Sequence, residues 1–221
     1  MWAINYLITN IKSFIFCIRY LPLSIAIKMP ILVGFSFKIK KMKRGSILIE
    51  TDKIHRNMIS LGLGGTEGVV SNKGMLYIDE GAKLVFKGNA MISAGCSVRL
   101  DKNAECVIGN NLITMNKNSF LRCSTSIKIG NDVLIGWGVT INDNDGHNIV
   151  MDNRIKPKKG PIVIGNHVWI ASHVTINKNS VIPDNSVVAQ HSIVNCAFDK
   201  QNILLAGCPA KLVKESINWM L

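Results

Sequence analysis

A polar segment, INDNDGHNIV at residues 141–150, interrupts long aliphatic runs. It places Asn142, Asp143 and Asp145 within a few positions of His147. A neutral imidazole can accept a proton near neutral pH, which makes His147 a candidate general base. The two carboxylates could orient that imidazole or hold a polar ligand, and Asn142 could do the latter. The same residue types also build loop-capping Asx turns, so the sequence leaves both roles open.

A six-residue repeat governs the part of the chain that follows. From Ile164 the sequence divides into IGNHVW, IASHVT, INKNSV, IPDNSV, VAQHSI and VNCAFD, each beginning with Ile or Val. An α-helix cannot keep every sixth residue on one face, but a coil of three short strands can, with eighteen residues to a turn and strands about 4.8 Å apart. The first positions of successive turns should then stack in three pairs: Ile164 with Ile182, Ile170 with Val188, and Ile176 with Val194.

The same pattern extends upstream and predicts one continuous parallel β-helix over residues 46–197, irregular at its start. Its first positions fall at Ile129, Ile135 and Ile141, with weaker echoes at Ile108, Thr114 and Phe120, and around Ile78, Leu84, Ile92 and Val98. Ile164 follows Ile141 by 23 positions where the repeat expects six, so about 17 residues are extra. They predict a loop at about 142–161, and loops on rigid scaffolds often carry binding and catalytic residues.

The first 45 residues form a separate apolar segment. Apolar residues recur at intervals of three and four from Ile4 to Ile18, which predicts a helix that Leu21-Pro22 should end. The longest uncharged run, residues 1–11, is shorter than the ~18 residues needed to span a bilayer. We favour packing of this helix on the main body or on a neighbouring subunit. The alternative is a peripheral membrane contact through residues 1–44, to which Trp2, Tyr6 and the basic run at 38–44 would contribute.

Charge and cysteine usage narrow the class of partners. The 221 residues carry 26 Lys and Arg against 14 Asp and Glu, a net charge of +12, which favours polyanions such as anionic lipid, acidic polysaccharide or a phosphorylated cofactor. Nucleic acid is disfavoured because aromatic residues do not interleave with the basic ones. Six cysteines without a C-x-x-C pair indicate reduced thiols, and no secretory signal is apparent, so we expect a cytoplasmic protein.

The repeat, the D-x-D-x-H cluster, the run IGNHVWIASHVTI and the ending AGCPAKLVK together resemble the hexapeptide-repeat acyltransferases. They are most similar to the branch that O-acetylates sugars of capsules and lipopolysaccharide O-antigens. The likeness covers roughly residues 75–215. It implies a mainly β fold, namely a left-handed parallel β-helix, to which we add the N-terminal helix predicted above and a short C-terminal helix within residues 198–221. It also implies a homotrimer that uses acetyl-CoA as co-substrate, bound between adjacent subunits.

The resemblance also implies roles for individual residues. His147 would take the proton from a sugar hydroxyl as that hydroxyl attacks the thioester directly, without an acyl-enzyme cysteine. Trp137 could stack on the acceptor sugar, although core packing is an equal expectation. Acetyl-CoA would contact the coil and the C-terminal turn through Trp169, Ala171, Ser172, Ala189, Gly207, Pro209, Ala210, Lys211 and Lys214. The chain departs from the family at Lys211 and Lys214, where arginine is common, and at Gln190 and His191, where small residues are common.

Two other functions remain open on the same scaffold. Serine or sugar-nucleotide N-acetyltransfer is one, although residues 1–70 lack room for the extra domains of those enzymes. A non-enzymatic assembly module is the other, although it has no need of the D-N-D-G-H cluster. No metal is expected: His173 and His191 should stack one turn apart with His167 a side away, and the H-x-x-x-x-H spacing of related β-helical carbonic anhydrases is missing.

Overall fold

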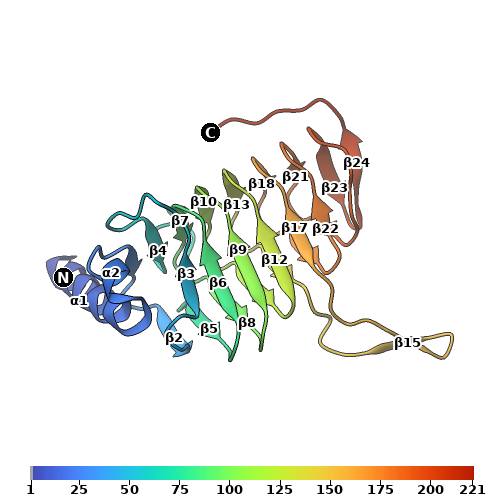
Figure 1. Cartoon of the computed structure of the whole chain (residues 1–221). Helices are drawn as coiled ribbons and strands as arrows, with labels where there is room; N and C mark the ends of the chain where they lie inside the picture. The colour runs from blue at the N-terminus through green and yellow to red at the C-terminus, as the bar shows by residue number, and fades with distance from the viewer. Residues whose placement is uncertain (1) are drawn as a thin grey trace.

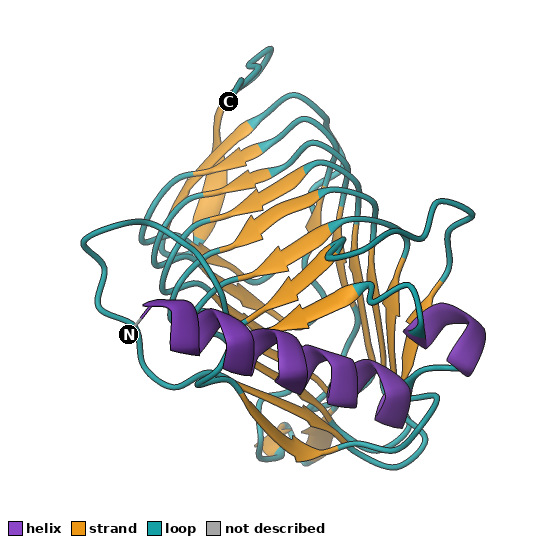
Figure 2. Cartoon of the chain, turned by 90° about the vertical axis from the view of Figure 1, so that its left-hand side faces the viewer, coloured by secondary structure: helices purple, strands orange, loops and turns teal. Residues whose placement is uncertain are grey.

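The computed structural model describes residues 2–221, with side chains from residue 5 onward. Helix α1 (Trp2–Tyr20) lies across the end of a coil of strands, and the short helix α2 (Leu23–Ala26) follows it (Figures 1 and 2). Helix α1 ends directly before Leu21-Pro22, as predicted, because the residue before a proline is displaced from helical geometry. Neither helix in residues 2–221 has the length and hydropathy needed to cross a bilayer.

Most of the described residues wind into three parallel sheets, one on each side of a prism (Figure 1). Sheet A contains β1 (Ile31–Val33), β4 (Ile59–Leu61), β7 (Ala90–Ile92), β10 (Leu112–Met115), β13 (Val133–Ile135), β18 (Trp169–Ile170), β21 (Val187–Val188), β23 (Leu204–Gly207) and the antiparallel β24 (Ala210–Lys214). Sheet B contains β2 (Lys38–Lys41), β5 (Met75–Ile78), β8 (Ser97–Leu100), β11 (Phe120–Cys123), β14 (Thr140–Asn142), β19 (Thr175–Asn177) and β22 (Ile193–Val194). Sheet C contains β3 (Ile47–Ile49), β6 (Lys83–Phe86), β9 (Glu105–Ile108), β12 (Ser126–Ile129), β17 (Ile162–Ile164) and β20 (Val181–Ile182).

The eighteen-residue turn is confirmed in the C-terminal half of the coil. The three predicted stacks are the observed strand registers: Ile164 with Ile182, Ile170 with Val188, and Ile176 with Val194. These side chains are buried in the prism interior. The excursion is confirmed as well, because Ile129 pairs with Ile164, which lies one turn and 17 further residues along the chain.

Two predictions about the coil are wrong in detail. Strands β1 and β2 already belong to sheets A and B, so the coil begins near residue 31 and not at 46, and β23 extends it beyond 197. The predicted first positions Thr114 and Phe120 are wrong by one residue: Met115 and Leu121 are the buried residues. The strands here are four residues long and β10 has an irregular register, so a strict period of six slips.

Asparagine side chains connect successive turns at the corner between sheets C and A. The Asn110 backbone N–H donates to Asn131 Oδ1 at 2.8 Å, and the Asn131 N–H donates to Asn166 Oδ1 at 2.9 Å. The Asn166 N–H donates in turn to Asp184 Oδ1 at 2.7 Å. These side chains accept hydrogen bonds from backbone N–H groups at the corner, where strand pairing stops. This explains why a turn-forming Asn or Asp recurs near the start of each repeat.

The predicted C-terminal helix is wrong. Strand β24 pairs antiparallel with β23 across a turn that contains Gly207 (φ 105°) and a cis Cys208-Pro209 peptide. The last residues then run back across the coils as an extended tail (Figure 1). Pairing with the sheet edge satisfies the backbone groups of residues 210–214, and this tertiary contact overrides any local helical preference.

Helix α1 packs on the main body, as predicted, but its apolar stripe does not make this contact. The helix rests on the fold through Thr9, Ser13, Phe16 and Cys17, whereas the stripe itself is exposed at Leu7, Ile8, Ile11, Phe14 and Ile15. The side chains of Trp2 and Ile4 lie outside the described ones. The stripe therefore needs a partner other than the β-helix of its own chain.

Candidate active site

The excursion leaves the prism at the corner between sheets B and C. It contains a hairpin of β15 (Ile149–Met151) and β16 (Arg154–Lys156) that projects away from the coil (Figure 1). Asp152 and Asn153 form its tip with φ angles of 49° and 57°, which suit a two-residue hairpin turn. The apolar side chains of this arm, Ile149, Val150, Met151 and Ile155, are all exposed.

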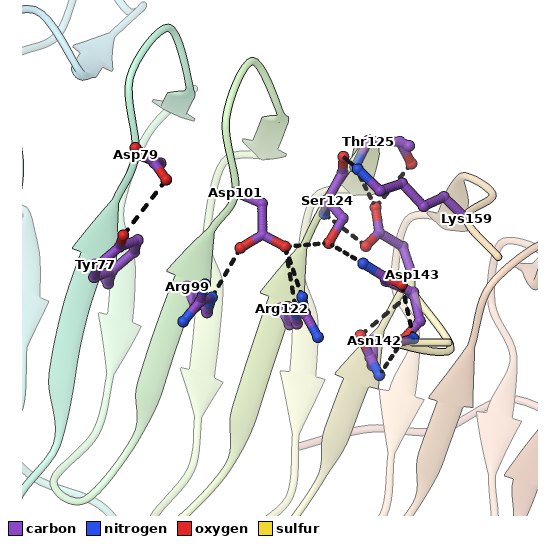
Figure 3. Close-up of polar contacts among 12 residues, drawn as sticks. Tyr77, Asp79, Arg99, Asp101, Arg122, Ser124, Thr125, Asn142, Asp143 and Lys159 are labelled. Atoms are coloured by element: carbon purple, nitrogen blue, oxygen red, sulfur yellow. Dashed lines mark hydrogen bonds and ion pairs between the residues drawn. The ribbon is translucent and has the colours of Figure 1, made fainter. Parts of the chain in front are cut away.

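Asp143 holds the base of the excursion. Its fully buried carboxylate accepts hydrogen bonds from the Ser124 N–H at 2.6 Å, the Thr125 N–H at 2.7 Å and the Thr125 hydroxyl at 2.8 Å (Figure 3). Its carbonyl also accepts from the Gly160 N–H, which closes the far end of the excursion. Because its carboxylate is buried and occupied by these donors, the structure favours the loop-capping role of Asp143 over contact with an acceptor.

Successive Asx turns carry the chain from this base to His147. The Asn142 amide donates to the Asn144 carbonyl at 2.8 Å, and the Asn144 N–H donates back to Asn142 Oδ1 at 3.2 Å. Asn144 Oδ1 then accepts from the Gly146 N–H at 2.8 Å, while its Nδ2 donates to Ser124 Oγ. Asn144 is a further residue of the loop whose alternation with aspartate in the sequence is the signal of consecutive Asx turns.

His147 follows Gly146 and is exposed to solvent. Asp145, two residues earlier, forms an ion pair with Lys178 Nζ at 2.5 Å. Because Asp143 holds the loop and Asp145 pairs with Lys178, the chain directs both carboxylates to partners other than the imidazole. Lys178, which the sequence did not mark, also donates to the Pro157 carbonyl at 2.6 Å and so braces the returning arm of the excursion.

A row of charged side chains anchors this base to the coil (Figure 3). Asp101 accepts from Ser124 Oγ at 2.5 Å, from Arg99 Nε at 2.8 Å and from Arg122 at 3.0 Å. Burial raises the pKa of Asp101, but the hydrogen bonds from Ser124 and the two arginines outweigh burial and lower it. Lys159 Nζ reaches the Ser124 carbonyl at 3.3 Å, so both arms of the excursion meet at one fixed turn.

The structure places Trp137 at a different corner, between sheets A and B. The half-buried indole lies edge-on against His173, with ring centroids 4.3 Å apart. His173 stacks on His191 at 4.9 Å with the rings 10° from parallel, as the spacing predicted. His167, His173 and His191 have φ angles of 52°, 59° and 59°, so all three occupy left-handed corner positions. Within one chain, Trp137 and His147 thus do not share a site.

Of the predicted cofactor contacts, Ala171, Ser172 and Ala189 lie at this same A–B corner, Trp169 begins strand β18 of sheet A, and the others lie on the hairpin of β23 and β24. The Ala171 N–H donates to the Val188 carbonyl and the Ala189 N–H to the Leu205 carbonyl, which stacks these alanines in one file beside Ser172. Gly136 extends the file downward, since a Cβ there would lie 2.6 Å from the Ser172 nitrogen. Gly207 and Pro209 lie in the exposed turn, Lys211 and Lys214 are exposed on β24, and Ala210 is buried.

Trp219, which sequence reasoning missed, lies beside the predicted cofactor residue Trp169 at the corner between sheets C and A. Its indole stacks on His167 at 4.3 Å, donates to the His167 carbonyl at 2.8 Å, and lies 6.3 Å from the exposed Trp169. The tail thereby covers the coil beside Trp169. No local pattern signals this contact, because 52 residues separate the two partners.

The buried thiols are poor nucleophiles. Burial raises the pKa of Cys96 to about 11 and that of Cys106 to about 12, and it also raises the pKa of Cys123. A thiol attacks as its thiolate, so burial keeps these side chains unreactive. Within residues 2–221 no group of three or more His, Cys, Asp or Glu side chains is placed to hold a metal ion.

Comparison with known proteins places the chain in a family. The uncharacterized 24.8 kDa protein in the cps region of Klebsiella pneumoniae is 36% identical over 201 residues, which cover 91% of this chain and 86% of that protein. No protein-family model matches. The crystal structure of the polysialic acid O-acetyltransferase OatWY matches 86% of this chain and 90% of its own with a TM-score of 0.50 and 25% identity.

A second solved structure shares the fold. The polySia specific acetyltransferase NeuO matches 84% of this chain and 89% of its own, with a TM-score of 0.59 and 20% identity. The chain belongs to the hexapeptide-repeat acyltransferases and adopts their left-handed parallel β-helix. Within that family it is a relative of the cps-region protein and is similar to a polysialic acid O-acetyltransferase.

Proposed function

We propose that the protein is an acetyl-CoA-dependent O-acetyltransferase that modifies a hydroxyl of a capsule or O-antigen saccharide in the cytoplasm. The observation that carries this proposal is an exposed His147 on a rigidly clamped excursion of an acyltransferase coil. The likeness to OatWY supports O-acetylation of a saccharide. The net charge of +12 supports an acidic acceptor, because opposite charge raises the local concentration of a polyanion.

Direct transfer needs one group that moves a proton in both directions. Nε2 or Nδ1 of His147 accepts the proton of the sugar hydroxyl as its oxygen attacks the thioester carbonyl carbon. The tetrahedral intermediate collapses as the C–S bond breaks, and the imidazolium returns the proton to the departing thiolate. An acetyl ester and free CoA result. Backbone N–H groups near the excursion are the candidate donors to the developing oxyanion.

The two halves of the site lie at different corners of one prism, and this separation supports a homotrimer. His147 leaves the B–C corner, whereas the alanine file of Ala171 and Ala189 runs along the A–B corner. A neighbouring copy can bring the excursion of one subunit to the file of the next. The exposed apolar arm formed by β15 and β16 offers the surface for that contact.

In this arrangement acetyl-CoA lies between subunits. The small side chains of Ala171, Ser172 and Ala189 leave room for an extended pantetheine along the prism wall. Trp169 contacts the same pantetheine chain. The exposed ammonium groups of Lys211 and Lys214 attract the phosphates of the cofactor as point charges. Asn142, Asp145 and, from the other corner, Trp137 are the candidates for holding the acceptor.

The test is release of free thiol from acetyl-CoA in the presence of a panel of saccharides that includes polysialic acid. We expect His147→Ala to lower kcat by ~10²–10⁴-fold, the usual contribution of a general base. His55→Ala is the matched control, because His55 is an exposed imidazole on an early coil that contacts Asn89. Undiminished activity of His147→Ala would remove the proposed base, and thiol release with serine would indicate serine acetyltransfer instead.

A further inference from the structure

Helix α1 faces the fold with the opposite side from the one its sequence favours. Its buried face includes the small hydroxyl residues Thr9 and Ser13, and Ser13 Oγ donates to the Thr9 carbonyl at 2.7 Å while accepting from the Val33 N–H at 2.8 Å. The large apolar side chains point outward: Leu7 is 60% exposed, Ile11 52%, Phe14 53% and Ile15 56%. An unshielded row of this size on a stable helix marks an interaction surface.

The helix is held firmly in this orientation. Lys12 Nζ donates to the carbonyls of Gly34 and Phe35 at 2.9 and 3.0 Å and to that of Phe37, which fixes one flank of α1 to the loop after β1. Phe16 and Cys17 pack into the core cluster on the inner face. The outward row is therefore a fixed surface, and α1 itself lies at the end of the molecule (Figure 2).

Cationic groups border this surface. Residues 1–49 contain eight Lys and Arg and no Asp or Glu. Lys41 and Lys43 pair with Asp79 and Glu80, so they contribute little net charge.

Other cationic side chains lie at the helix itself or directly after α2. Arg44 donates to the Ile18 carbonyl at 2.7 Å, Arg56 approaches Asn10 Oδ1 at 3.4 Å, and Arg19 stands in the last turn of α1. Exposed Lys28 follows α2. The outer face of α1 thus combines an apolar centre with a cationic border, the combination by which a helix binds in the plane of an anionic bilayer.

We infer that α1 is a membrane-binding helix that lies in the surface of an anionic bilayer and attaches this end of the protein to it. The apolar row of Leu7, Ile11, Phe14 and Ile15 would enter the boundary between headgroups and acyl chains, with the arginines at the phosphates. A second copy fits this face poorly, because pairing two such ends would bring two wholly basic segments together. The inference does not depend on the proposed reaction.

Co-sedimentation of the full chain with lipid vesicles tests the inference. We expect binding to vesicles that contain phosphatidylglycerol, weakening as salt is added, and little binding to phosphatidylcholine alone. Ile11→Asp combined with Ile15→Asp should lower binding at least about tenfold, because two apolar side chains no longer enter the bilayer. Arg19→Gln combined with Lys28→Gln should lower it roughly fivefold per charge removed and reduce the salt dependence.

The control is Val70→Asp, which places the same type of substitution at a side chain that is 88% exposed on the loop between β4 and β5. It should bind vesicles as the wild type does, and thermal unfolding followed by circular dichroism should show that all variants fold. Failure of the wild type to bind phosphatidylglycerol vesicles would overturn the inference, as would full binding by the Ile11/Ile15 variant. A change of oligomeric mass in that variant, without vesicle binding by the wild type, would assign the face to a protein contact.

Discussion

The two aspartates of the excursion are chemically identical but occupy opposite surroundings. Asp143 is buried with three donors on its carboxylate, whereas Asp145 is exposed and pairs with Lys178. Both were candidates for holding the acceptor, since D-N-D-G is equally typical of binding loops and of Asx turns. Which aspartate turns inward depends on Ser124 and Thr125, about 20 residues away, and no local pattern reports such a contact.

Replacement of Asp143 should therefore affect both stability and catalysis. In Asp143→Asn one amide hydrogen-bond donor must face the N–H groups of Ser124 and Thr125, which should lower the free energy of unfolding by roughly 1–3 kcal/mol. The kcat of the proposed reaction should fall as well, because the segment that carries His147 loses its anchor to the coil. Urea unfolding and steady-state kinetics measure the two effects.

Asp145→Asn is the matched control for stability. Its partly exposed ion pair should contribute no more than about 1 kcal/mol. Equal stability of the two variants would contradict the assignment of Asp143 to the loop base.

At the scale of elements, the regular six-residue repeat after Ile164 predicted the strand registers better than the irregular repeat upstream did. The register of β17 to β22 followed from one apolar residue in six, because a narrow prism admits a β-branched side chain at only one position of each side. Upstream, longer strands blurred that period at Thr114 and Phe120. The hairpin of β23 and β24 and the outward face of α1 could not be predicted, because contacts distant in sequence determine them.

The charged row beneath the excursion should make stability depend on pH. The folded pKa of Asp101 lies below its ordinary value of 3.8, so this carboxylate contributes its full stabilisation above about pH 4 and loses it as the pH falls through the folded pKa. Asp101→Asn should lower the free energy of unfolding at pH 7 by roughly 1–3 kcal/mol. On acidification below about pH 4, the free energy of unfolding of this variant should also fall by less than that of the wild type.

Urea midpoints at pH 7 and pH 3 measure this difference. Asp52→Asn, at an exposed position, serves as control and should stay within about 0.5 kcal/mol of the wild type. If the urea midpoint of Asp101→Asn fell between pH 7 and pH 3 by as much as that of the wild type, Asp101 would be ruled out as the source of the pH dependence.

For the molecule as a whole, the separation of His147 from the alanine file predicts complementation between subunits. His147→Ala removes the proposed base, and Ala171→Trp should block the proposed pantetheine path, so each variant alone should have little activity. Co-expression of the two should restore activity, because mixed trimers contain interfaces in which a native His147 meets a native Ala171.

Thiol release from acetyl-CoA by affinity-purified mixed trimers measures the restoration. Co-expression of His147→Ala with wild-type chain is the control for assembly. Mixed trimers as inactive as their parents would show that each subunit completes its own site.

The two ends of the coil are closed by unlike elements. Helix α1 lies against the first turn, and β24 runs antiparallel on the last strand of sheet A. A stack of parallel strands left bare at either end would present free backbone donors and acceptors to another copy, which could add turn upon turn into a filament. Because α1 and β24 cover the two edges of sheet A, another copy cannot add a strand to either end of this sheet.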